Sequence, residues 1–64
     1  MQDFQQRVVD EKKELDEKVT KLRAFIHTEQ FDSLDGNEKI RLWRQADAMG
    51  VYSSVLGERI EAFK

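Results

Sequence analysis

Residues that break helices are almost absent from this chain, except in one stretch near its middle. The sequence contains no proline, and its three glycines stand at positions 36, 50 and 57. Proline and glycine are the residues that disfavour helices most strongly. Because the stretch from His27 to Asn37 is the main interruption, the sequence predicts two long helices, about residues 3–27 and 36–63, joined by a connection that holds one short helical turn.

Apolar residues recur along both segments at the spacing of an amphipathic helix. In the second segment the steps alternate between four and three residues from Leu42 to Phe63, which is a heptad pattern. Two such helices joined by about ten residues pack most simply as an antiparallel hairpin. We therefore predict an all-α fold in which residues 1–64 form a single helical-hairpin domain. The matching apolar residues of the first segment are Phe4, Val8, Leu15, Val19, Leu22 and Ile26.

The two apolar stripes also predict which residues face each other across the hairpin. When the stripes are aligned, Val8 faces Leu56, and Lys12 meets Ser53 in a polar layer between apolar ones. A polar layer of this kind sets the register of two packed helices. At the start of the second helix, Asp35 followed three residues later by a glutamate is typical of a capping box.

A chain of 64 residues with 39% apolar residues has little material for a core. It has no cysteine and a single histidine, which excludes disulfides and the usual structural zinc sites, and no cofactor is expected. We therefore expect copies of the chain to associate into a helical-bundle homo-oligomer that covers a second apolar stripe. The predicted interface residues are Phe4, Val9, Phe25, Trp43, Gly50, Val55 and Gly57.

The overall charge narrows the range of partners. Eleven basic and 13 acidic side chains give a net charge of −2, which argues against a nucleic-acid-coating role. No apolar run approaches the length of about 20 residues that a membrane span needs. The polar start of the chain does not resemble a signal peptide. We expect a cytoplasmic protein without a membrane partner, in the cytoplasm of the host cell if a phage encodes it.

Six cations lie in two short segments, one on each predicted helix, which the hairpin brings side by side. We call these six cations, together with Trp43, the basic collar. Arginine forks match phosphate oxygens and an indole stacks on a flat base, so the collar suits a small phosphorylated ligand. The alternative is that these cations are solvated helix flanks that form ordinary i, i+4 pairs. The cations of the collar are Lys18, Lys21, Arg23, Lys39, Arg41 and Arg44.

Small residues form a line along the second helix, which we call the small-residue notch: Ala46, Gly50, Ser53, Ser54 and Gly57. A glycine inside a helix costs about 1 kcal/mol relative to alanine, so another feature should compensate. Either another helix approaches closely at this line, or a ligand enters it. Taking the collar and the notch together, the predicted ligand-binding residues are Lys21, Arg41, Trp43, Arg44, Tyr52, Ser53, Ser54 and Arg59.

No pattern in the sequence indicates catalysis. Paired carboxylates such as Asp10 and Glu14 fall on polar helix faces, without the apolar pocket that raises a pKa for acid catalysis. A glycine-rich phosphate loop and a metal-ligand cluster are both missing. We expect a protein that is not an enzyme and holds no metal.

Three segments resemble a group of small proteins encoded by tailed phages and prophages. They are RVVDEKKELDEK at residues 7–18, KLRAFI at residues 21–26 and YSSVLGERI at residues 52–60. In architecture the group is similar to phage helical-hairpin proteins that oligomerise and sequester the cyclic nucleotide messengers of CBASS or Thoeris immunity. The resemblance implies a non-enzymatic protein that inhibits bacterial anti-phage defence by holding such a messenger. It transfers no binding residue to this chain.

A different class of function stays open at this point. The second apolar stripe also suits a protein–protein interaction module that inhibits or scaffolds a host or phage protein. The two hypotheses differ in what they require of the cations, because only the first needs them to meet at one ligand.

Overall fold

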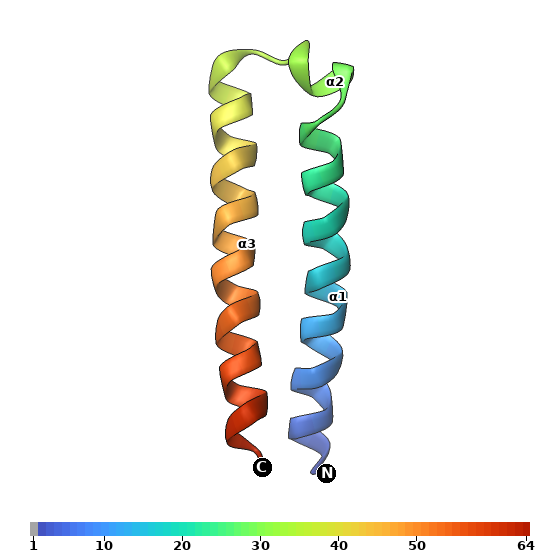
Figure 1. Ribbon diagram of the computed structural model, residues 1–64, viewed down its shortest axis with the longest axis vertical. Coiled ribbons are helices and arrows are strands. Elements are labelled where there is room, and N and C mark those ends of the chain that lie inside the picture. Colours follow the sequence, from blue (N-terminus) through green and yellow to red (C-terminus); the bar gives the residue numbers. More distant parts are fainter. Residues whose placement is uncertain (1) are drawn as a thin grey trace.

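The computed structural model describes residues 2–64, so Met1, which the predicted domain includes, lies outside the described residues. It contains α1 (Asp3–Ile26), the single turn α2 (Glu29–Asp32) and α3 (Gly36–Ala62). Helices α1 and α3 pack side by side, with both termini at the same end of the rod (Figure 1). The molecule measures 46 × 14 × 13 Å. The predicted all-helical hairpin is confirmed, and each long helix ends one residue earlier than predicted.

Both α2 and α3 begin with a side chain that caps the helix N-terminus. The Thr28 hydroxyl accepts a hydrogen bond from the Phe31 amide at 3.3 Å, at the start of α2. At the start of α3, the Asp35 carboxylate accepts one from the Glu38 amide at 3.0 Å. The reciprocal half of the predicted capping box does not form, because the Glu38 carboxylate accepts from Arg41 Nε at 2.8 Å instead. Asp35 alone therefore caps α3.

The core is a narrow seam between α1 and α3. Leu56 is fully buried in this seam, with 0% of its surface exposed. Leucine, valine and alanine meet here at the positions that the heptads predict. Few side chains are buried for a chain of this length, which fits the small core expected from composition. The buried apolar residues are Val8, Leu15, Val19, Phe31, Ala46 and Leu56, and Met49, Ile60 and Phe63 pack against them partly buried.

Aromatic contacts close the hairpin at both ends. At the turn, Phe31 of α2 is 3% exposed, and its ring centre lies 5.6 Å from that of Trp43 and 6.2 Å from that of Phe25. At the other end, the rings of Phe4 and Phe63 meet edge to face with centres 5.9 Å apart. The short turn α2 is therefore a plug that seals the loop end of the seam.

Within residues 2–64, no helix combines the length and the apolar character needed to cross a membrane.

Candidate functional site

A polar network crosses the seam midway along the rod. Lys12 Nζ donates to Ser53 Oγ at 2.9 Å and to Asp16 Oδ2 at 2.9 Å, and Ser53 in turn donates to the Asp16 carboxylate. The hydrogen bond from Ser53, followed by that from Lys12, lowers the pKa of Asp16 below its ordinary value. The predicted pairing of Lys12 with Ser53 is confirmed. Asp16 was missed, although its position four residues after Lys12 on the same helix was a usable signal.

The two glycines of the small-residue notch face cationic side chains of α1. A methyl group added at Gly50 would lie 3.1 Å from Arg23 Nη2, and one added at Gly57 would lie 3.4 Å from Lys12 Cε. No backbone atom of α1 comes within 4 Å of either position. Within one chain, the notch is therefore occupied by long cationic side chains and not by a closely approaching helix.

An open groove of about 590 Å³ runs along α1, and we call it the α1 groove. Three ammonium groups and two carboxylates border a floor built from side-chain carbon. One of its residues, Lys21, was predicted as a ligand residue, whereas Lys12 and Lys13 were not. The lining residues are Val9, Lys12, Lys13, Asp16, Glu17, Thr20 and Lys21 of α1, with Ile60 of α3.

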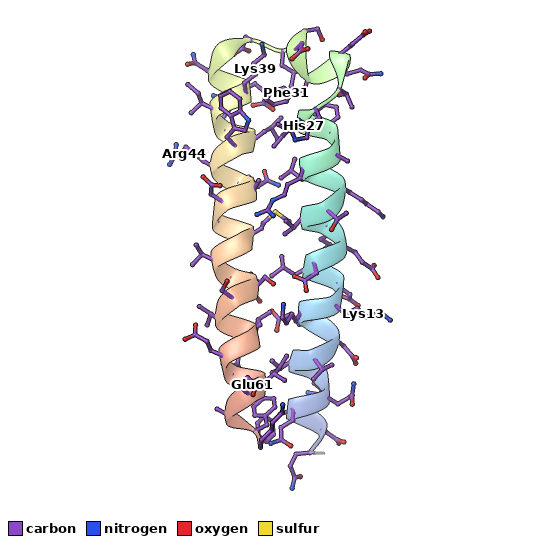
Figure 2. The ribbon with its side chains drawn as sticks, in the orientation of Figure 1. Lys13, His27, Phe31, Lys39, Arg44 and Glu61 are labelled. Carbon is purple, nitrogen blue, oxygen red and sulfur yellow. The ribbon has the colours of Figure 1, made fainter. Side chains whose placement is uncertain are left out.

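A second open groove, of about 530 Å³, lies on α3 and shares no residue with the first. This α3 groove is lined by Arg41, Arg44, Gln45, Asp47 and Ala48. Figure 2 shows why the two surfaces are separate: Arg44 points away from α1 on one side, and Lys13 points away from α3 on the other. The cations of the basic collar therefore do not meet at one surface, because Lys21 lines the α1 groove whereas Arg41 and Arg44 line the α3 groove. Arg23 instead reaches across the seam to Gly50.

The remaining predicted ligand residues are spread over α3. Trp43 packs on the Phe31 ring while 49% of its own surface stays exposed. Ser53 turns into the polar network, and Tyr52, Ser54 and Arg59 are exposed. In residues 2–64, the structure brings no three histidine or carboxylate side chains together that could hold a metal ion.

Several predicted interface residues have partners inside the chain. Phe4 packs on Phe63, Phe25 and Trp43 pack on or near Phe31, and the two glycines face the cations of α1. Val9 lines the α1 groove. Val55 is 46% exposed. Ile40, which belongs to the predicted second apolar stripe, is 51% exposed, and Val51, which that stripe omitted, is 65% exposed.

Comparison with known proteins gives one informative result. No curated protein and no solved structure matches the chain significantly. The model of one protein family, described as Sequestin, matches residues 2–62, which is nearly the whole chain. This match spans both long helices and the turn between them, and the chain belongs to the Sequestin family.

Proposed function

We propose that this protein binds and sequesters a small phosphorylated ligand, and that the ligand is a cyclic nucleotide signal of bacterial anti-phage defence. The observation that carries the proposal is the family match over residues 2–62, since the family name denotes sequestration. The resemblance of three segments to phage proteins supports the same function and suggests the class of ligand.

The α1 groove is the surface that best suits such a ligand. Ligand sites are mostly apolar with a few well-placed polar groups. Here the carbon stems of Lys13 and Lys21, with Val9 and Ile60, offer apolar surface beneath ammonium groups. The ammonium groups can neutralise phosphate while a base lies on the apolar floor. Neither Lys13 nor Lys21 has an ion pair within residues 2–64, so both charges are free for a ligand.

The chemistry of the groove favours holding a ligand over converting it. Asp16, one of the two carboxylates that line the groove, has a lowered pKa and is therefore ionised at neutral pH. A general acid needs the opposite shift, towards a raised pKa. We propose a binding protein without catalytic activity that acts by stoichiometric capture and functions as an assembly of several copies.

Calorimetric titration with a panel of cyclic dinucleotides and trinucleotides tests this function. We expect saturable binding of at least one compound, and its recovery unchanged by chromatography. Lys13→Ala and Lys21→Ala should each weaken binding by about tenfold, which corresponds to about 1.4 kcal/mol. Lys18→Ala is the matched control, because Lys18 lies on the same helix but does not line the groove.

Absence of binding across the panel would overturn the cyclic nucleotide ligand. Recovery of a converted compound would overturn sequestration, since capture requires that the ligand stays intact. If Lys18→Ala weakened binding as much as Lys21→Ala, the α1 groove would not be the site.

A further inference from the structure

One side of α3 is apolar but has no partner in the chain. Ile40, Val51 and Val55 are 51%, 65% and 46% exposed. Their spacing of eleven and four residues places them on one side of a helix with 3.6 residues per turn. Ala48 and Ala62 share this side and are also exposed. We call these five residues, with Arg44 and Glu58 between them, the outer α3 face.

The outer α3 face points away from the core. Ala46 and Leu56, which are buried against α1, lie on the opposite side of α3. Arg44 belongs to the outer face, and Figure 2 shows its side chain extending away from α1. From Ile40 to Ala62 the face runs for about 33 Å, which is most of the 46 Å rod. An apolar strip this long on a small chain marks an interaction surface.

The charges on this face select the partner and its direction. Arg44 and Glu58 are exposed, and neither forms an ion pair within residues 2–64. A second copy running parallel would set Arg44 against Arg44 and Glu58 against Glu58. A second copy running antiparallel sets opposite charges together. Like charges that meet at an interface disfavour association, so the antiparallel arrangement is favoured over the parallel one.

The positions along the helix fit an antiparallel pair centred on Val51. Arg44 precedes Val51 by as many residues as Glu58 follows it, so Arg44 meets the partner subunit's Glu58, twice by symmetry. Ile40 and Ala62 are also equally far from Val51 and meet in the same way. Val51 then packs on its own copy at the two-fold axis. One register thus pairs opposite charges and covers the apolar residues together.

We propose that two copies of this chain associate through their outer α3 faces, antiparallel, with Val51 at the two-fold axis and Arg44 paired to the partner subunit's Glu58. The proposal gives a surface and a direction to the self-association included in the proposed function. It does not involve the α1 groove, so ligand binding and this contact can be tested separately.

A charge-swap series measured by sedimentation equilibrium tests the contact. The wild-type chain should be at least dimeric, and Arg44→Glu and Glu58→Arg should each weaken association by about tenfold. The double variant Arg44→Glu with Glu58→Arg should restore it, because the swapped charges again attract. Lys18→Glu, the same charge change on α1, is the control that should leave association unchanged.

A second variant distinguishes loss of association from loss of folding. Val51→Asp places a carboxylate on the two-fold axis and should give a monomer, with the helical content of the wild type by circular dichroism. A monomeric wild-type chain would overturn the proposal and leave the face to a different protein. An association that is unaffected by both single charge reversals would also overturn it, because the copies would then meet elsewhere.

Discussion

Lys12 of α1 donates a 2.9 Å hydrogen bond to Ser53 of α3, although the two residues lie 41 positions apart in the sequence. This bond belongs to the polar network that interrupts the apolar seam, and it holds the two helices in one register. Slipping by one heptad step would leave Lys12 against an apolar residue. A buried or half-buried polar group without a partner costs more than the hydrogen bond contributes, so the network disfavours other registers.

Ser53→Ala should lower the free energy of unfolding by about 1 kcal/mol, because it removes the hydrogen bonds that join Ser53 of α3 to Lys12 and Asp16 of α1. Urea unfolding at one fixed protein concentration measures the change, since association contributes to apparent stability. Ser54→Ala is the matched control: the neighbouring serine is exposed, so its replacement should change stability by less than about 0.5 kcal/mol. Equal effects of the two variants would show that the network does not stabilise the fold.

Stability should fall in acid partly through Asp16. Its pKa is lowered in the folded chain, so the folded state binds fewer protons than the unfolded state near that pKa. The stabilisation is therefore present above the unfolded pKa of about 3.9 and is lost as the pH falls through the lower folded value. Asp16→Asn should flatten the pH dependence of the unfolding midpoint in this acid window.

A titration of the Asp16 carboxyl by NMR checks the cause of the shift. Ser53→Ala should raise the pKa of Asp16 towards its ordinary value, because the serine hydrogen bond is the largest contribution. An Asp16 pKa that stays the same in this variant would show that Ser53 is not the cause.

The hairpin and its register follow from the sequence for a physical reason. Helical periodicity places Val8 and Leu56 on facing stripes, and the absence of breakers leaves the turn as the place to fold back. In this register, Lys12 and Ser53 lie at the same position along the rod and face each other. Asp35 and Thr28 also act as helix caps, as their residue types predict.

The arrangement of charge around the rod could not be predicted from the sequence. Lys21 and Arg44 were assigned to one collar because they lie at similar positions along the rod, but they project from different helices into separate grooves. Long cationic side chains also bend across the seam, as Arg23 does over Gly50. Heptad positions fix the direction of the first side-chain bond only, so the destination of a guanidinium group four bonds further on cannot be obtained from spacing.

Gly50→Ala should raise the free energy of unfolding by up to about 1 kcal/mol, because alanine is the better helix former. The added methyl group would meet only Arg23 Nη2, the far end of a flexible side chain, at 3.1 Å. Thermal unfolding of the variant measures the gain. Gly57→Ala, where the methyl group would lie in ordinary contact with Lys12 Cε, should behave alike. Destabilisation by Gly50→Ala would instead indicate that the backbone of another copy packs at this position.

Phe31→Ala should undock the α2 plug from the loop end of the hairpin. Phe31 is 3% exposed and contacts Trp43, with Lys39 Nζ lying 5.9 Å from its ring centre (Figure 2). Truncating a buried phenylalanine to alanine costs about 3–5 kcal/mol, a large share of the stability of so small a fold. Urea unfolding should therefore show a strong loss, and the Trp43 fluorescence should shift to longer wavelength as its ring is uncovered.

Two further variants separate the loss of Phe31 contacts from general damage to the turn. Phe31→Leu keeps an apolar side chain and should lose less than half as much stability, with an intermediate fluorescence shift. Gln30→Ala changes the exposed neighbour in the same turn and should leave both the stability and the Trp43 emission close to wild type. An unshifted Trp43 emission in a folded Phe31→Ala chain would mean that α2 does not depend on this ring for docking. None of Phe25, Phe31 and Trp43 lines the α1 groove or belongs to the outer α3 face, so Phe31→Leu should keep both ligand affinity and association.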